Sequence, residues 1–184
     1  CLEGRQLLIN DDDLRGKITS ERLNAVTNKK DFEGYSALFY LISDSTGTGL
    51  NLLKNDTTLR GKITADGLNA TIPASSDKGK SPLFNLVTTP MGLQLFMDDA
   101  RLRGKVTAKG LNTLIYNSKF SRYSVLSVLT SKNVGIQLLA RDEVLRGKIT
   151  AEGLNAITRG TISGTSPLLS LAKHELGIQL LRDD

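Results

Sequence analysis

Apolar residues recur along the chain in short groups that have the spacing of one helix face. Leu83, Leu86 and Val87 form one such group, and a matching group begins at Leu168. This i, i+3, i+4 pattern is typical of a half-buried helix. Proline, glycine and hydroxyl residues separate the groups, so each predicted helix is only two or three turns long.

The same groups return at a nearly fixed period, which identifies an internal repeat. The sequence Leu-Arg-Gly-Lys occurs four times, with spacings of 45, 43 and 43 residues between its arginines, Arg15, Arg60, Arg103 and Arg146. A Gly-x-(Gln/Asn)-Leu-(Leu/Phe) block, a Leu-Asn pair and a Ser-(Pro/Ala/Val)-Leu block keep the same period. The chain therefore divides into four units and the start of a fifth, at approximately 4–48, 49–91, 92–134, 135–176 and 177–184.

Each unit contains start and stop signals for about three short helices. Ser81-Pro82 and Thr89-Pro90 each place a capping hydroxyl before a proline at the first helical position, where the missing N–H costs nothing. The Gly of each Leu-Arg-Gly-Lys block is expected to end the second helix in the left-handed conformation. A threonine such as Thr107 then caps the third helix. The predicted fold is all-α, a right-handed helical repeat solenoid of four such units plus a partial fifth.

The composition agrees with this class and excludes several kinds of site. Aromatic residues make up only 5% of the chain and Trp is absent, which suits leucine-packed helices better than a sheet. Cys1 is the single cysteine, so the chain has no internal disulfide and no Cys/His zinc motif. No apolar run approaches the ~18 residues of a transmembrane helix. We expect a soluble, intracellular, monomeric repeat domain over 1–184, cut from a longer protein.

Several blocks of the unit resemble the ankyrin repeat. Ser-Pro-Leu at 166–168 is similar to the family's Thr-Pro-Leu helix entry, Gly-Ile-Gln-Leu-Leu at 177–181 to its second helix, and Leu-Asn-Ala at 154–156 to its turn. The unit exceeds the ankyrin length of about 33 residues by about ten, and lacks the family's His after Thr-Pro-Leu. An armadillo-type stack of three helices is the structural alternative. The resemblance implies a protein-binding platform like those in effector proteins that intracellular bacteria deliver into host cells.

No constellation in the sequence supports catalysis. His174 is the only histidine, and no Ser or Cys nucleophile motif accompanies it. We interpret the acidic groups Asp11–Asp13, Asp98-Asp99 and Asp183-Asp184 as a solvated face rather than a metal site. We therefore predict no enzyme activity, catalytic residue, cofactor or metal in this segment. A catalytic domain elsewhere in the full protein, positioned by the repeats, is a further hypothesis that the segment itself does not test.

The net charge of +5 and the pI of about 9.4 permit attraction to nucleic acid, anionic lipid or an acidic protein. The alternative function is a basic stripe that binds the phosphates of nucleic acid or phosphoinositide. Its residues are Arg15, Lys17, Arg60, Lys62, Arg103, Lys105, Arg146 and Lys148. The helix-end interpretation already accounts for these blocks, and no aromatic stacking motif is interleaved with them.

Repeated amide side chains allow two interpretations. The asparagines of the Leu-Asn pairs are Asn24, Asn69, Asn112 and Asn155, and the glutamines of the second helix are Gln94, Gln137 and Gln179. An asparagine row can bind the backbone of a captured peptide, as in armadillo proteins. We favour the other interpretation, in which each asparagine closes a turn by bonding to nearby backbone.

The stretches that differ between units form the predicted recognition surface. They are residues 27–35, 72–80, 115–123 and 158–165. Repeat proteins keep a fixed scaffold and vary one edge for recognition, and Tyr and Arg dominate interface hot spots. The candidate partner-binding residues are Lys29, Lys30, Phe32, Tyr35, Lys78, Lys80, Tyr116, Lys119, Phe120, Arg122, Tyr123 and Arg159. We expect a protein partner with an acidic surface, bound by these loops and the adjoining concave helix face.

Overall fold

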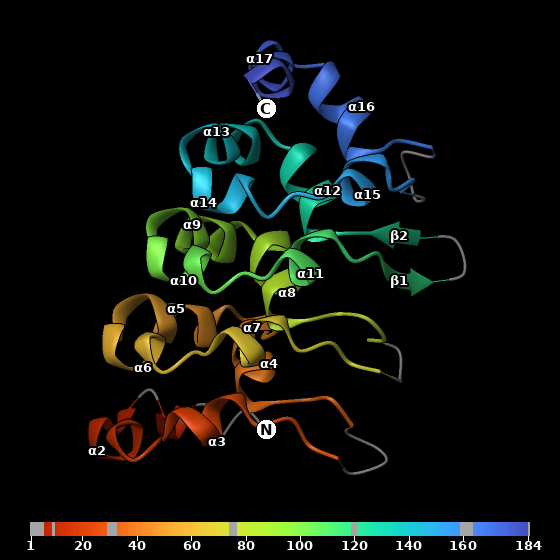
Figure 1. Ribbon diagram of the computed structural model, residues 1–184. Helices are drawn as coiled ribbons and strands as arrows, with labels where there is room; N and C mark the ends of the chain where they lie inside the picture. Colours follow the sequence, from red (N-terminus) through yellow and green to blue (C-terminus); the bar gives the residue numbers. More distant parts are fainter. Residues whose placement is uncertain are drawn as a thin grey trace.

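The computed structural model describes residues 6–8, 10–28, 33–73, 77–118, 121–158 and 164–183. These residues are mostly helical, which confirms the predicted all-α character. β-structure within them is limited to one two-stranded hairpin and a bridge between Thr158 and Thr165. Figure 1 shows similar layers that follow one another in sequence order, with the N-terminus in the lowest layer and the C-terminus in the highest.

The helices fall into four rows, which we name A to D in the order in which a unit supplies them. Row A contains α5 (Thr48–Asn55), α9 (Pro90–Asp98), α13 (Asn133–Arg141) and α17 (Glu175–Asp183). Row B contains α2 (Asp12–Gly16), α6 (Thr57–Gly61), α10 (Ala100–Gly104) and α14 (Glu143–Arg146). Row C contains α3 (Ser20–Asn24), α7 (Ala65–Asn69), α11 (Ala108–Asn112) and α15 (Ala151–Asn155). Row D contains α4 (Ala37–Ile42), α8 (Pro82–Thr88), α12 (Val125–Thr130) and α16 (Pro167–Ala172).

Hydroxyl side chains begin the helices of rows C and D, as the sequence predicts. The Ser81 hydroxyl accepts a hydrogen bond from the backbone N–H of Phe84 at 3.1 Å, and Pro82 occupies the first turn of α8. In row C the Thr107 hydroxyl accepts from the N–H of Gly110 at 3.0 Å. Each cap satisfies one of the N–H groups that a helix start leaves without a partner.

Row B shows where the helix prediction was wrong. Asp99 has extended backbone, with φ −115°, and its carboxylate caps α10, so the expected second helix is split into α9 and α10. Gly104 is the last residue of α10 and does not have a positive φ, and the C-cap residue Lys105 that follows has φ −81°, so the predicted left-handed glycine does not occur there. The Lys105 N–H bonds back to the carbonyls of Arg103 and Leu102, which tightens the last turn and closes the helix without a left-handed residue.

The described ends of each of the four varied stretches pair with each other, and we name these paired segments hairpins 1 to 4 along the chain. In hairpin 3, β1 (Ile115–Ser118) pairs antiparallel with β2 (Ser121–Tyr123). In the others, backbone N–H groups donate across the described ends, from Thr27 to Tyr35 at 2.8 Å, from Ile72 to Lys80 at 3.0 Å and from Thr158 to Thr165 at 2.8 Å. Hairpins 1 and 2 have a second such bond in the return direction, from Gly34 to Thr27 at 2.8 Å and from Gly79 to Ile72 at 2.7 Å. The hairpins project along one edge of the molecule, and rows A and B lie at the opposite edge (Figure 1).

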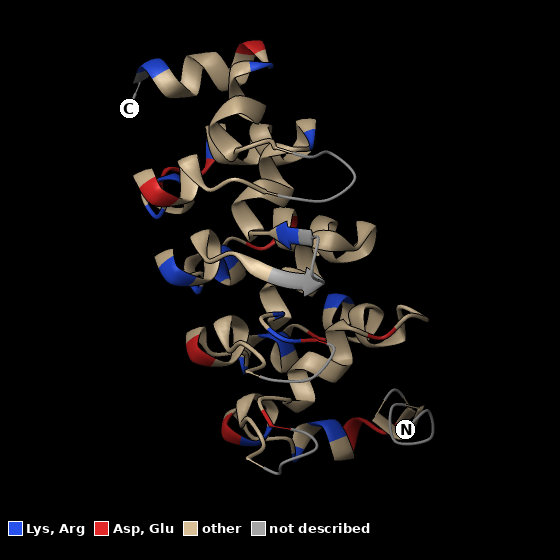
Figure 2. Ribbon diagram, turned by 90° about the vertical axis from the view of Figure 1, so that its right-hand side faces the viewer, with Lys and Arg blue, Asp and Glu red and all other residues tan. Residues whose placement is uncertain are grey.

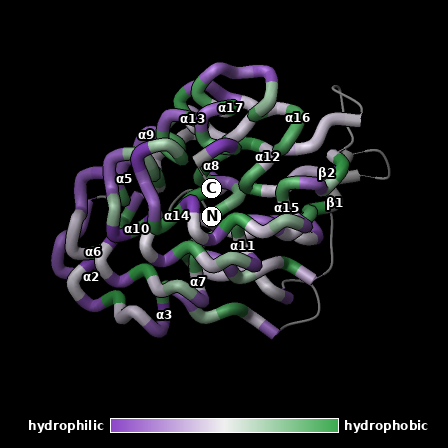
Figure 3. Tube along the Cα trace, turned by 45° about the horizontal axis from the view of Figure 1, so that its top comes forward, coloured by the Kyte–Doolittle hydropathy of each residue, from purple (hydrophilic) through white to green (hydrophobic). Residues whose placement is uncertain are grey.

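Leucine-rich faces join the layers into one continuous core. Successive row D helices contact each other, α4 with α8, α8 with α12 and α12 with α16, and rows A and C also make contacts between layers. The buried apolar cluster extends from Leu23 in row C of the first layer to Leu180 in α17. Hydrophilic stretches follow the outer bends at α2 and α6 (Figure 3). None of the described helices is long and apolar enough to cross a membrane.

Candidate protein-binding edge

The arginines of the Leu-Arg-Gly-Lys blocks link successive layers through row B. The Arg60 Nε donates to the Oδ2 of Asp99 in the next layer at 2.5 Å, and its Nη1 donates to the carbonyl of Leu53 at 2.7 Å. Arg15 makes the equivalent bond to Asp56 at 3.2 Å, and Arg103 donates to Asp142. Arg60 and Arg103 thus each hold the end of their own row A helix and the helix-capping carboxylate of the following layer.

The lysines of the same blocks reach back to the preceding layer. The Lys62 Nζ donates to the carbonyls of Arg15 and Gly16 at 3.4 and 3.3 Å. Lys148 contacts the carbonyls of Arg103 and Gly104 in the same manner, at 3.4 and 3.1 Å. Burial lowers the pKa of the equivalent Lys105 and outweighs the opposing attraction of Asp99. Figure 2 shows that basic and acidic residues recur from layer to layer, as expected when charged side chains of one layer bond to groups of the next.

These contacts give the aspartates a structural role that the sequence interpretation missed. The side chains of Asp99 and Asp142 are each only 14% exposed, so neither lies on a solvated face. Burial by itself raises the pKa of Asp99, but hydrogen bonds from Arg60, Leu102 and Arg101 together outweigh burial and hold the pKa below its usual value. Burial and an Arg103 hydrogen bond compete in the same way at Asp142, whose pKa is also lowered.

The asparagines form a second set of links, in row C. Asn69 Nδ2 donates to the carbonyl of Ala65 in its own helix at 2.7 Å and to the carbonyl of Lys105 in the next layer at 2.9 Å. Its Oδ1 accepts from the backbone N–H of Thr107 at 3.1 Å. Asn24 and Asn112 make the same three bonds. The asparagines therefore bond to nearby backbone, as favoured, but they also join two layers.

The proposed phosphate stripe loses support from this arrangement. All of its arginine and lysine side chains except Lys17 are already engaged, with Arg15, Arg60 and Arg103 only 14–16% exposed. Arg146 donates to the carbonyls of Leu139 and Ala140 at 3.2 and 3.3 Å, and Lys17 is exposed. An open groove of about 800 Å³ lies beside α2, α5 and α6, but its Arg15 and Lys62 are those bonded to Asp56 and to backbone carbonyls.

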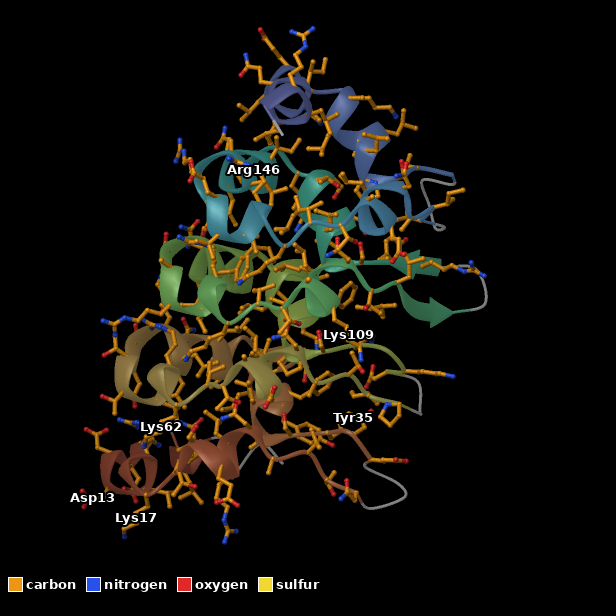
Figure 4. All side chains as sticks on the ribbon, in the orientation of Figure 1. Asp13, Lys17, Tyr35, Lys62, Lys109 and Arg146 are labelled. Atoms are coloured by element: carbon orange, nitrogen blue, oxygen red, sulfur yellow. The ribbon has the colours of Figure 1, made fainter. Side chains whose placement is uncertain are left out.

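The candidate partner-binding residues fall into three groups. Lys29, Lys30, Phe32, Lys119, Phe120 and Arg159 lie outside the described residues. Tyr116 lies in β1, opposite Arg122 of β2, and its side chain is outside the described part. The structure places the side chains of the remaining five, Tyr35, Lys78, Lys80, Arg122 and Tyr123, at the hairpin edge. Figure 4 shows Tyr35 at this edge, well separated from Lys62 and Arg146.

Two of these five side chains hold hairpins together. The Tyr35 hydroxyl donates to the Oδ2 of Asp77 in the next hairpin at 2.9 Å. Lys80 Nζ contacts the other carboxylate oxygen of Asp77 at 2.7 Å, and this hydrogen bond is the main reason that the pKa of Asp77 is lowered. Lys78 is exposed at the turn, whereas Tyr123 is half-buried and packs against the core. Hairpins 1 and 2 are therefore coupled through Asp77, which receives Tyr35 from the first hairpin and Lys80 from its own.

An aromatic cluster at the base of hairpin 1 includes a residue that the sequence interpretation did not select. The Tyr40 ring stacks on Tyr35 with centroids 5.3 Å apart, and Phe39 meets Tyr35 edge to face at 5.2 Å. Phe39 is buried, whereas Tyr40 is 46% exposed. The signal was present in the alignment of the units, because the fifth residue of the Ser-x-Leu block varies, as Tyr40, Asn85, Val128 and Ser170.

Shallow grooves lie between the hairpins and the helices on both sides. One of about 240 Å³ lies on the row D side of hairpins 3 and 4, with Tyr123, Ser131, Lys173 and His174 in its wall. Another of about 380 Å³ lies between α7 and α11 and includes Asp66 and Lys109. Their walls are mostly small and polar, which suits contact with a protein surface or an extended peptide.

No feature of these grooves indicates a reaction centre. His174 is half-buried and is surrounded in its groove by hydroxyl residues and Lys173, without a carboxylate or thiol. In the part of the chain that the structure describes, no three His, Cys, Asp or Glu residues gather in a way that would hold a metal ion. Comparison of the chain with protein-family models, curated proteins and solved structures finds no significant match.

Proposed function

We propose that this chain is a protein-interaction scaffold, an ankyrin-like solenoid of four units and a partial fifth. It binds its partner through the hairpins and the adjoining concave face of row D. The observation that carries the proposal is the separation of repeated and varied residues. Most of the repeated Arg, Lys, Asp and Asn side chains, including Arg60, Lys62 and Asn69, are engaged in links between layers, whereas the varied residues gather at the hairpin edge.

The distribution of charge supports a partner with an acidic surface. The four varied stretches contain seven Lys or Arg residues and three Asp or Glu residues, so they carry +4 of the net charge of +5. The charged residues elsewhere in the chain nearly balance each other. A basic edge on an otherwise neutral scaffold steers an acidic surface to that edge.

The exposed Tyr40 supplies the apolar part of the proposed interface. An interface needs a desolvated anchor as well as charge, and tyrosine is among the residues that most often provide it. The ring is held by its stacking on Tyr35, which in turn is fixed by Asp77. Such an anchor loses little side-chain freedom on binding, because it is already ordered.

The proposal is tested by affinity capture from cell lysate with the immobilised chain, with and without nuclease treatment and at low and high salt. The edge variant carries Tyr40→Ala and Lys78→Ala, both exposed and outside the links between layers. The matched control carries Asn51→Ala and Lys54→Ala in α5, which are exposed at the opposite edge. We expect one protein to be retained at high salt by the wild type and the control but lost by the edge variant. Equal retention by both variants, or recovery of nucleic acid or lipid alone, would contradict the proposal.

A further inference from the structure

The groove on the row D side of hairpins 3 and 4 lies where the third layer differs from the first two. Ser127 of α12 is in its wall, whereas Phe39 and Phe84 stand at the same position of the first two layers. Both phenylalanine side chains are buried, at 3% and 7% exposed. The smaller Ser127 therefore leaves room in the third layer, and the groove of about 240 Å³ is found there.

Hydroxyl groups are common in the wall of this groove, but several of them are bonded to backbone. Thr130 stands where Ile42 and Val87 stand in the first two layers, and it is 0% exposed. Its hydroxyl donates to the carbonyl of Leu126 at 3.0 Å. The Ser131 hydroxyl likewise donates to a carbonyl of α12, at 2.9 Å. These hydroxyls make the wall polar, but their protons are already used.

Four other wall residues carry hydrogen-bond donors that meet no acceptor within the described part of the chain. They are Tyr123, Ser170, Lys173 and His174. Lys173 is exposed and the other three are half-buried, so a group bound in the groove can reach them. No Asp or Glu is among the described residues of the wall. An ammonium, an imidazole and two hydroxyls around a space without carboxylates favour a bound anion.

A phosphoryl group matches these donors better than a carboxylate does. It has three terminal oxygens and a charge of about −1.5 to −2 near neutral pH. Lys173 and a protonated His174 together balance that charge, whereas the single charge of a carboxylate balances only one of them. The hydroxyls of Tyr123 and Ser170 supply two further donors for the remaining oxygen positions.

We infer that this groove binds the phosphoryl group of a phosphorylated serine on the protein partner. The inference rests on the proposed function, because the groove lies between the hairpins and row D, on the surface that meets the partner. It also gives Tyr123, which the sequence selects as a candidate, a defined role as a hydrogen-bond donor. The partner is then recognised by its modification as well as by its acidic surface.

The experiment uses the imidazole proton resonance of His174, since this residue is the only histidine of the chain. The chain is titrated at constant pH with phosphoserine blocked at both ends, with glutamate blocked in the same way, and with inorganic phosphate. We expect the blocked phosphoserine to shift the resonance saturably and to bind about tenfold more tightly than the blocked glutamate.

Two variants and a matched control assign the binding to the groove. Ser127→Phe fills the groove with the residue of the first two layers, where Phe84 makes the same backbone bond to its capping serine. Lys173→Gln removes one exposed charge. Each is expected to weaken phosphoserine binding about tenfold or more, because a charged donor or the space itself is lost. Lys54→Gln makes the same charge change on exposed α5, at the opposite edge, and should bind as the wild type does.

Three results would overturn the inference: no saturable shift, equal affinity for phosphoserine and glutamate, or equal binding by Lys173→Gln and Lys54→Gln. Inorganic phosphate that binds more tightly than phosphoserine would assign the groove to a free ion and would overturn it as well. The proposed function is judged separately by the capture experiment. A partner that is retained through Tyr40 and Lys78, and retained equally after phosphatase treatment of the lysate, contradicts this inference alone.

Discussion

The side-chain oxygen of Asn69 accepts a hydrogen bond from the backbone N–H of Thr107, 3.1 Å away in the next layer. Thr107 is itself the cap of α11, so the link between the layers is attached directly to the start of a helix. Asn24 and Thr64 have the same relationship at 3.0 Å. A layer therefore stabilises the helix of its neighbour, which favours cooperative folding of adjacent layers.

Replacement of Asn69 tests the strength of this link. Asn69→Ala removes two bonds between layers and leaves the Thr107 N–H and the Lys105 carbonyl without their partner. We expect a loss of about 1–3 kcal/mol in the free energy of unfolding, measured by urea denaturation. The control is Asn155→Ala, which removes only a bond within its own helix. Similar losses in both variants would show that the link between layers contributes little.

Two glycines of the third unit are expected to respond in opposite ways to the same substitution. Gly110→Ala places a Cβ against the Asn69 side chain and is expected to lower the free energy of unfolding by about 1–3 kcal/mol. Gly104→Ala adds a Cβ that meets nothing within 4 Å, in helical backbone. It is expected to be neutral or to stabilise the chain by up to ~1 kcal/mol. Thermal unfolding of the two variants and the wild type measures whether each substitution raises or lowers the stability.

Acid is expected to weaken the row B links. The pKa of Asp99 in the folded chain lies below its ordinary value of 3.8, so the unfolded chain takes up a proton first as the pH falls. The resulting stabilisation is complete above that ordinary value and is lost as the pH falls through the folded-state pKa. Asp99→Asn should therefore be less stable at neutral pH and lose less stability on acidification. Urea midpoints across the acid range measure this, with exposed Asp98→Asn as the control.

The Tyr35 hydroxyl is expected to couple the first two hairpins. Tyr35→Phe keeps the ring contacts with Phe39 and Tyr40 but removes the hydrogen bond to Asp77. The loss in unfolding free energy should be about 1 kcal/mol, and amide exchange should accelerate in hairpins 1 and 2 but not in hairpin 4. Tyr40→Phe is the control, since it retains both aromatic contacts. Faster exchange in all hairpins would indicate general destabilisation rather than loss of a local link.

The local structure followed from the sequence because its determinants are close along the chain. The hydroxyl caps at Ser81 and Thr107 and the proline at the start of α8 each act within three residues, and the structure confirms them. The apolar spacing likewise predicted the buried face that contains Leu83 and Leu86. The split at Asp99 was missed, because an aspartate inside an acidic group gives no sign that its carboxylate will cap a new helix.

The links between layers could not be read from the sequence, because their partners are 36 to 47 residues apart. Arg103 and Gly104 were interpreted together as one helix stop, although the arginine pairs with Asp142 and the glycine is ordinary helical backbone. Gly110 is the glycine that the repeat requires, because a Cβ atom at this position would overlap the Asn69 side chain of the preceding unit. Such contacts are difficult to predict from a repeat sequence, because both partners of each contact are themselves repeated residues.

The position of Gly110 against Asn69 also bears on how such a gene can change in length. An in-phase duplication or deletion of 43 residues within the region from Arg60 to Arg146 leaves each asparagine facing a glycine, and each row B arginine facing an aspartate. Unequal recombination between units would thus produce longer or shorter proteins whose new junctions already match. The varied hairpins would be carried along with their units, so the same event would reorder the recognition surface.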